Sequence, residues 1–126
     1  MPSPLMVELF VSLVETGKGL DAMERFYAED ARMRENQADP RVGKAALLAH
    51  EAAAQAAVAG LTAQCVRPIL VAGDTVVIRW LFEYRDSVDR PIRFEEIAYQ
   101  RWVGDKISEE QFFYDPVQFR PRDAKP

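Results

Sequence analysis

Residues 26–50, FYAEDARMRENQADPRVGKAALLAH, contain the end of a helix, a short polar strand, a Pro/Gly turn and the start of an alanine-rich helix. The stretch holds a carboxylate (Glu35), two amides (Asn36 and Gln37) and the only histidine of the chain (His50). A helix that follows a polar strand end can fold back over it and enclose the polar groups. The stretch therefore predicts the wall of a pocket.

Two further helices are predicted around this stretch. Apolar residues at helical spacing indicate a helix over about residues 4–16, which Gly17 would end in a left-handed conformation. A second helix is expected over about residues 20–28, and nine alanines between residues 45 and 59 predict the third, closed by Gly60.

The second half of the chain has the character of a β-sheet. After a short strand at 31–35, segments rich in β-branched and aromatic residues predict antiparallel strands at 61–72, 75–85, 92–103 and 106–115. Pro116 would end the last strand, and residues 116–126 are predicted to be a flexible tail. Three helices packed on one face of a strongly bent antiparallel sheet make an α+β fold, in a single domain over residues 1–126.

Composition excludes several classes of function. The net charge is −4 and the basic residues are scattered, which disfavours nucleic-acid binding. No run approaches the ~20 apolar residues of a membrane span, and the apolar stretch near the N-terminus lacks the positive charges of a signal peptide. Cys65 is the only cysteine, so an internal disulfide is ruled out, and a cytoplasmic location is expected.

Three segments carry a resemblance to a known family: FVSLVETGKGLDAMERFYAEDARM (10–33), PRVGKAALLAH (40–50) and EEIAYQRWVGDKISEEQFFYDP (95–116). In order and spacing they resemble the SnoaL-like branch of the nuclear-transport-factor-2-like superfamily, over roughly residues 5–115. The resemblance implies a cone-shaped α+β fold with a pocket between helices and curved sheet, commonly in a homodimer. Members include ketosteroid isomerases, polyketide cyclases, epoxide hydrolases, dehydratases and binding modules, so the fold does not select one chemistry.

The isomerase branch of this family allows a comparison residue by residue. Its general-base aspartate follows an FADDATVED-type run, and Glu35 holds the corresponding place in YAEDARMRE. Phe10 and Ala98 stand where the branch has its oxyanion tyrosine and aspartic acid. Because both donors that would stabilise an enolate are missing, steroid isomerase activity is not expected.

Alternation along the strands, carried over from the resemblance, predicts which side chains face the pocket. The expected inward set is Trp80, Phe82, Phe94, Glu96, Ala98, Gln100, Glu110, Phe112 and Tyr114. A slip of one residue would instead turn Glu95, Glu109 and Gln111 inward. With Phe10 and Asn36, the uncharged members of the inward set are the candidate ligand-binding residues. Asn36 is explained equally well by turn formation, and the aromatic residues by plain core packing.

Four side chains are candidates for acid/base catalysis. Glu35 would be a general base and His50 its proton-shuttling partner. The alternatives are that Glu35 is salt-bridged to Arg32 or Arg34, and that His50 is simply hydrogen-bonded. Glu96 and Glu110 lie on neighbouring predicted strands and could come close enough to share a proton. Glu110 could otherwise lie at the sheet edge, or pair with Arg101 or Arg79.

The sequence gives no sign of a cofactor. One histidine and one cysteine supply no metal-ligand cluster, and there is no glycine-rich phosphate loop. The leading hypothesis is binding of a small apolar organic molecule in the cone, with cofactor-free isomerisation, cyclisation or dehydration. The rival hypothesis is a non-catalytic ligand-binding or dimerisation module. A homodimer is expected under both, through the outer sheet face that carries Arg79, Leu81, Ile97 and Tyr99.

Overall fold

The structure is a computed structural model, and it describes residues 1–119. The three helices are α1 (Pro4–Glu15), α2 (Gly19–Phe26) and α3 (Lys44–Ala56). The strands are β1 (Tyr27–Glu35), β2 (Arg41–Val42), β3 (Ala59–Ala72), β4 (Thr75–Arg85), β5 (Pro91–Val103) and β6 (Lys106–Phe113), followed by the short 3-10 helix η1 (Pro116–Phe119).

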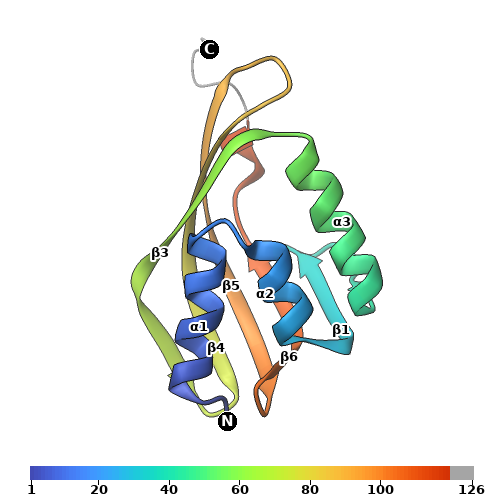
Figure 1. Cartoon of the computed structure of the whole chain (residues 1–126), viewed down its shortest axis with the longest axis vertical. Helices are drawn as coiled ribbons and strands as arrows, with labels where there is room; N and C mark the ends of the chain where they lie inside the picture. The colour runs from blue at the N-terminus through green and yellow to red at the C-terminus, as the bar shows by residue number, and fades with distance from the viewer. Residues whose placement is uncertain (120–126) are drawn as a thin grey trace.

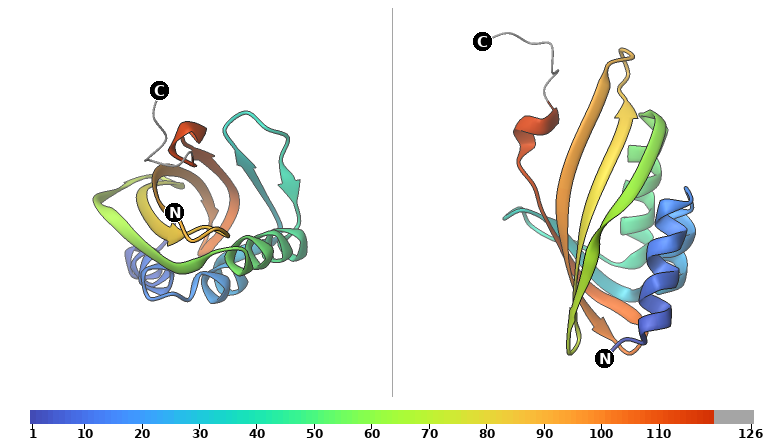
Figure 2. Two further views of the ribbon diagram at one scale, coloured as in Figure 1. Left: turned by 90° about the horizontal axis from the view of Figure 1, so that it is seen from above. Right: turned by 90° about the vertical axis from the view of Figure 1, so that its left-hand side faces the viewer.

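The strands form one sheet in the order β2-β1-β6-β5-β4-β3. The helices cover one side of this sheet (Figure 1), and from above the sheet is seen to curve around toward them (Figure 2). The predicted α+β cone is therefore confirmed. The sheet is not purely antiparallel, however, because β1 lies parallel to β6. Sequence periodicity does not report strand direction, so this parallel pair was not predicted.

The predicted inward register of the long strands is confirmed. Ala98 pairs with Ile78 on one side and with Phe112 on the other, and Gln100 pairs with Glu110. Ala98 and Gln100 are completely buried. The alternative register is wrong, since Glu95 forms an ion pair with Arg79 (2.6 Å) on the opposite, outer face.

Packing of α1 and α2 against the sheet creates the core. Phe10 meets Phe26 and Trp102 edge-on, with ring centroids 5.8 Å and 6.1 Å away. Phe26 and Trp102 are almost fully buried, and such aromatic contacts stabilise a core beyond the area they bury. This cluster fixes α1 and α2 against β5.

The helix boundaries differ from the predictions in informative ways. Gly17, at φ 81°, ends α1 as predicted, and Lys18 N donates to the Leu13 carbonyl behind it (2.8 Å). The second helix ends earlier than expected, because Tyr27 already pairs with Ile107 of β6. Gly60 does not close α3: it lies inside β3, which begins at Ala59 where it pairs with Arg85.

The tail that the sequence predicts to be flexible begins with residues 116–119. These residues form η1, and the Gln118 amide both accepts from Glu95 N (2.8 Å) and donates to the Glu95 carbonyl (3.0 Å). Phe119 packs on Phe94 at 4.9 Å between ring centroids. This aromatic contact and the Gln118 hydrogen bonds tie the segment to β5, although 39% of the Phe119 surface is exposed. The rest of the predicted tail, residues 120–126, lies outside the described residues.

Candidate functional site

A cavity of about 790 Å³ lies between the helices and the concave face of the sheet. Its aromatic lining consists of Phe10, Tyr27, Trp80, Phe82, Tyr84, Phe94, Phe112 and Phe119. Five glutamates also line it: Glu15, Glu35, Glu51, Glu96 and Glu110. Among the described residues that line this cavity there is no lysine or arginine. A cavity of this size, apolar with a few polar groups, is typical of a small-molecule site.

Glu110 is the most deeply buried of these carboxyl groups, with 3% of its surface exposed. Tyr27 donates its hydroxyl to Glu110 Oε1, and Gln100 Nε2 donates to Oε2 (2.7 Å). Gln100 is held in turn by Trp102, whose indole Nε1 donates to its Oε1 (2.9 Å). The chain of donors fixes the orientation of the carboxyl group. Glu110 is therefore neither at the sheet edge nor paired with an arginine.

The environment of Glu110 changes its titration. Burial raises the pKa of Glu110 to about 7, although the hydrogen bonds from Gln100 and Tyr27 act in the opposite direction. The pKa of Tyr27 is raised well above its ordinary value, by burial and then by the charge of Glu110. Tyr27 therefore remains a hydrogen-bond donor, while Glu110 changes its charge close to neutral pH.

Glu96 faces the cavity from β5, where it pairs with Trp80 of β4. No described residue forms a hydrogen bond or ion pair with its carboxyl group. Burial, followed by the charges of Glu110, Glu35 and Glu51, raises the pKa of Glu96 to about 8. The predicted sharing of a proton between Glu96 and Glu110 is not found, because the register places Gln100, not Glu96, opposite Glu110.

Glu35 lies at the rim of the cavity, with 37% of its side chain exposed. Tyr114 donates its hydroxyl to Glu35 Oε2 (3.2 Å), and Arg41 Nη1 lies 4.0 Å from Oε1. The ion-pair partner is thus Arg41, not Arg32 or Arg34. Burial and the charge of Glu35 raise the pKa of Tyr114 to about 12. Glu35 is a partnered, half-exposed carboxylate and differs in this from Glu96.

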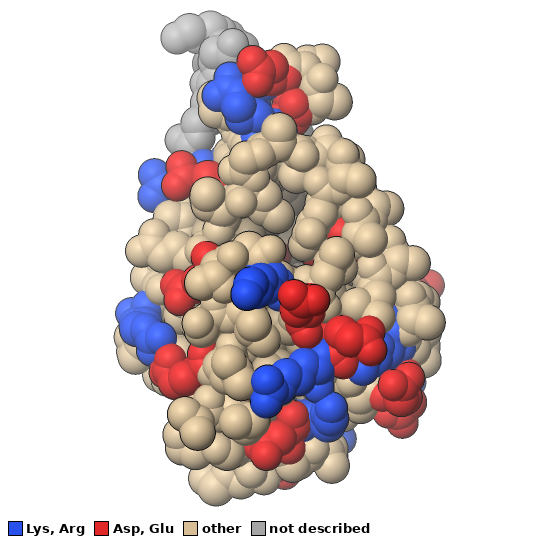
Figure 3. All heavy atoms as spheres, viewed as in Figure 1, with Lys and Arg blue, Asp and Glu red and all other residues tan. Residues whose placement is uncertain are grey.

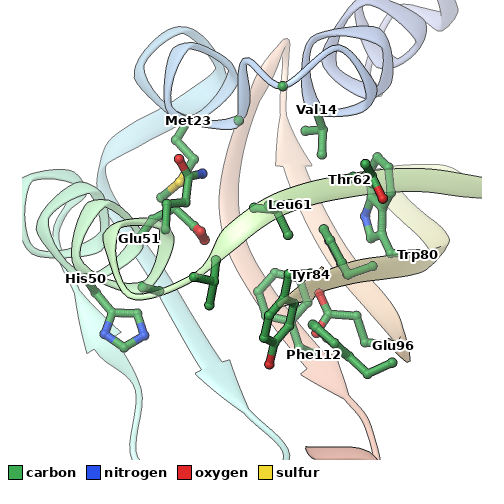
Figure 4. Close-up of a pocket in the computed structure, with 18 of the residues that line it drawn as sticks. Val14, Met23, His50, Glu51, Leu61, Thr62, Trp80, Tyr84, Glu96 and Phe112 are labelled. Carbon is green, nitrogen blue, oxygen red and sulfur yellow. The ribbon is translucent and has the colours of Figure 1, made fainter. Parts of the chain in front are cut away.

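His50 and its neighbour Glu51 occupy different positions on α3. His50 lines the outer part of the cavity, is exposed, and hydrogen-bonds to no described residue. Figure 4 shows Glu51 and Glu96 pointing into the pocket from opposite walls, while His50 lies further out. Burial raises the pKa of Glu51. The arrangement favours Glu51 over His50 as the functional side chain of this helix.

Sequence reasoning missed Glu51 and Tyr27. Glu51 follows the buried Leu47 by one helical turn, and this i, i+4 spacing would have placed it on the inward face. Tyr27 was assigned to a helix that in fact ends at Phe26. Its place beside Glu110 depends on the parallel β1–β6 pair, for which the sequence carries no signal.

The predicted ligand-binding residues divide into two groups. Phe10, Trp80, Phe82, Phe94 and Phe112 line the cavity, whereas Asn36, Ala98, Gln100 and Tyr114 do not. The last two still contact carboxyl groups that line it, Gln100 through Glu110 and Tyr114 through Glu35.

Asn36 is a turn residue. It adopts a positive φ of 50°, which asparagine tolerates well. Its carbonyl accepts from Gln111 Nε2 (2.6 Å), and its side-chain Oδ1 accepts from Tyr114 N (3.0 Å). The turn interpretation is therefore the one that the structure supports, and Asn36 ties the end of β1 to the end of β6.

Two further observations concern the described part of the chain. It contains no group of three or more histidine, cysteine, aspartate or glutamate side chains arranged to hold a metal ion. None of its helices is long and apolar enough to cross a membrane.

Comparison with known families agrees with this geometry. The model of the SnoaL-like domain matches residues 7–110, which is most of the chain. The chain belongs to the SnoaL-like family. None of the curated proteins compared with this SnoaL-like domain matches it significantly in sequence.

Solved structures share the fold of this SnoaL-like domain. A candidate SnoaL-like polyketide cyclase from Mesorhizobium loti is 23% identical, with 87% of this chain and 97% of the other covered and a TM-score of 0.75. A candidate SnoaL-like polyketide cyclase from Jannaschia sp. is 17% identical (98% and 97% covered, TM-score 0.80). A hypothetical protein from Catenulispora acidiphila with a ketosteroid isomerase-like fold, in complex with trimethylamine, is 18% identical (98% and 99% covered, TM-score 0.78). At these identities the likeness establishes the fold alone.

Proposed function

We propose that this protein binds a small, largely apolar organic molecule in its cone and moves a proton on it without a cofactor. Isomerisation, cyclisation and dehydration belong to this class of reaction. Solved SnoaL-like structures that are described as candidate polyketide cyclases support the cyclase and isomerase members of the class. A location in the cytoplasm is part of the same proposal.

The observation that carries the proposal is the contrast between two carboxyl groups in one cavity. Glu96 has no partner among the described residues and a pKa of about 8, whereas Glu110 is held by Tyr27 and Gln100 and has a pKa of about 7. General acid/base groups work best when their pKa lies near the working pH. In its ionised form, which increases as the pH approaches 8, Glu96 would take a proton from the ligand, and Glu110 would serve as the second acid/base.

Glu35 keeps a secondary role in this proposal. It is bound to Tyr114 and lies near Arg41, so a ligand would have to compete with these partners for it. The rival hypothesis of a purely structural polar interior would need the carboxyl groups to be locked in mutual hydrogen bonds without a cavity. An open cavity containing the unpartnered Glu96 favours the enzyme.

We also propose that two copies of the chain associate through the outer sheet face. The face carries the apolar side chains of Leu81, Ile97 and Tyr99; Leu81 is already buried within the chain (9% exposed), whereas 50% of the Tyr99 surface is exposed. A second copy would cover this surface, and the Arg79–Glu95 ion pair would lie beside it.

Proton transfer can be tested without knowing the natural substrate. Small enolisable ketones would be incubated with the protein in D₂O, and exchange at the carbon next to the carbonyl followed by NMR. Exchange by the wild type that Glu96→Gln abolishes would support the proposal. Glu95→Gln is the matched control, because Glu95 lies on the outer face. Tight binding of the ketones without exchange would contradict catalysis and favour a binding module.

A further inference from the structure

We propose that the ligand of this cavity carries a positive charge, as a substituted ammonium group bearing apolar substituents. This inference rests on the proposed use of the cavity as a ligand site, and it specifies the chemical class that the site accepts. Three features of the cavity carry it: the sign of its ionisable groups, the position of the unpaired ones and the nature of its walls.

The ionisable side chains of the cavity are nearly all acidic. Of its five glutamates, four have protein partners: Glu15 accepts from Cys65 N (2.9 Å), Glu35 is bound by Tyr114, Glu51 by the side chain of Gln55, and Glu110 by Tyr27 and Gln100. Glu51 and Glu96 form no ion pair with any described residue. Among residues 1–119, therefore, no lysine or arginine is paired with these two carboxyl groups.

The two carboxyl groups that lack a cation face each other across the cavity. Glu51 enters from α3 and Glu96 from β5, and both point toward the middle (Figure 4). A ligand in the middle would contact both. A neutral apolar ligand would keep both groups in their protonated form and an anion would be repelled by the ionised form, whereas an ammonium group would stabilise the ionised form of both.

Aromatic side chains complete a surface suited to a cation. Trp80 and Phe82 are tilted to each other at 5.9 Å between ring centroids, and Phe82 stacks on Phe94 at 5.1 Å. All three line the same wall as Glu96. Aromatic faces attract ammonium groups, most strongly where water is excluded, and they also accept apolar substituents.

The surface around the opening does not provide the selection. In the view of Figure 3 charged side chains of both signs are mixed over the helices, at the top and along the left-hand edge, and the rim of the hollow is mostly uncharged. Discrimination by charge must therefore occur inside the cavity, where the local dielectric constant is low and each interaction is stronger.

Binding of a cation should be linked to release of a proton. The titratable groups that line the cavity with Glu96 are Glu15 of α1, Glu35 and Tyr27 of β1, Glu51 and His50 of α3, Tyr84 of β4 and Glu110 of β6, and Tyr114 outside the lining is close enough to feel the charge of Glu96. In the empty cavity Glu96, with a pKa of about 8, is mostly protonated at neutral pH. A permanent cation binds the ionised form, so its affinity should rise with pH and level off above about pH 8.

Two probes of the same shape test the charge itself. Choline and 3,3-dimethylbutan-1-ol differ only in the replacement of the quaternary nitrogen by carbon. Binding would be measured by NMR titration at pH 8.5, where Glu96 is mostly ionised. We expect choline to bind at least about tenfold more tightly than the neutral alcohol, because only choline compensates the charge of the carboxylate. Between pH 6.5 and 7.5 its affinity should rise about tenfold, which is the slope for loss of one proton.

Variants connect the effect to the proposed residue. In Glu96→Gln the preference for choline and its pH dependence should fall to less than about threefold, whereas Glu95→Gln should bind like the wild type. A circular dichroism melt checks that both variants are folded, and Glu51→Gln, with a partial loss expected, tests the site if Glu96→Gln does not fold.

The outcomes separate this inference from the proposed function. Equal affinity for the two probes, or an unchanged preference for choline in folded Glu96→Gln, would overturn the inference that the ligand is a cation. The cavity would then remain a site for neutral ligands. Failure of both probes to bind at pH 8.5 would also overturn it. The exchange of ketones described above would then decide independently whether the cavity acts on neutral molecules.

Discussion

Tyr27 and Glu110 are joined by a hydrogen bond between the first strand of the chain and the last, inside the cavity. The tyrosine donates, and its own raised pKa keeps the proton on the phenol over the whole physiological range. The contact couples the one parallel pairing in the described sheet, β1 with β6, to the titration of a buried carboxyl group. It therefore connects the fold directly to the chemistry of the site.

Removing this donor should raise the pKa of Glu110. In Tyr27→Phe the ionised carboxylate loses one of its two hydrogen bonds, and the pKa should move above its present value of about 7. Carbon-13 NMR of glutamate-labelled protein would follow the titration. Tyr114→Phe is the control, since that hydroxyl contacts Glu35 instead. A pKa of Glu110 that stays the same or falls in Tyr27→Phe would contradict the assigned direction of the bond.

The two raised carboxyl pKa values should make the protein less stable as the pH increases. Glu96 and Glu110 titrate at about 8 and about 7 in the folded protein, against an ordinary value of 4.5. The folded state therefore binds more protons than the unfolded state between these values, and stability falls as pH rises through the window. One pKa unit corresponds to about 1.4 kcal/mol, so the loss between about pH 5 and pH 8 should amount to a few kcal/mol.

Urea denaturation at several pH values measures this dependence. At the acid end other groups act in the opposite sense: the pKa of Asp86 is lowered, first by the backbone N–H of Arg90, and its contribution is lost as pH falls. The stability maximum should thus lie on the acidic side of neutrality. Glu96→Gln should flatten the decline toward high pH. A urea midpoint that rises steadily from pH 5 to pH 8 would rule out the raised pKa values of the two buried carboxyl groups.

The carboxyl groups should differ in their importance for turnover. Glu96→Gln and Glu110→Gln should each lower kcat by about 10²–10⁴-fold, the usual contribution of general acid/base catalysis. Glu35→Gln should have a smaller effect, because Glu35 is half-exposed and occupied by Tyr114. Ketone exchange rates for the three variants, with unchanged thermal melts, provide the measurement. A Glu35 variant that is the most damaged of the three would restore Glu35 as the base.

A charge on the outer face should disrupt the proposed dimer. Tyr99→Asp replaces the exposed aromatic side chain of the outer face by a carboxylate, where burial against a second copy would be costly. Sedimentation at micromolar concentration should then shift from dimer to monomer. Val88→Asp, in the turn between β4 and β5, introduces the same charge away from the face and should remain dimeric. A wild-type monomer under these conditions would refute the proposed association.

Much of the architecture was predictable because its signals are local. Alternation fixed the inward face of β4 and β5, and Gly17 marked the end of α1. The site was harder. Glu35 and His50 stood out as a conspicuous polar pair in one stretch, yet the structure leaves one partnered at the rim and the other exposed.

The site residues that the structure favours over Glu35 and His50 are brought together by contacts between segments distant in sequence. Tyr27 and Glu110 are separated by 83 positions, and they meet only because β1 lies beside β6. The raised pKa of Glu96 likewise reflects enclosure and the charges of carboxyls on three other elements. Burial and long-range pairing are properties of the assembled fold, so no local pattern predicts them.

The parallel pairing of β1 with β6 also bears on how the protein folds. The strand that holds Glu110, β6, is the last strand in sequence, although it lies inside the sheet. The cavity is therefore incomplete until β6 docks beside β1. Contacts of such high sequence separation form late and slow folding. The ability to bind a ligand should therefore appear together with the final folding step. A ligand that is present during refolding would bind only the folded protein.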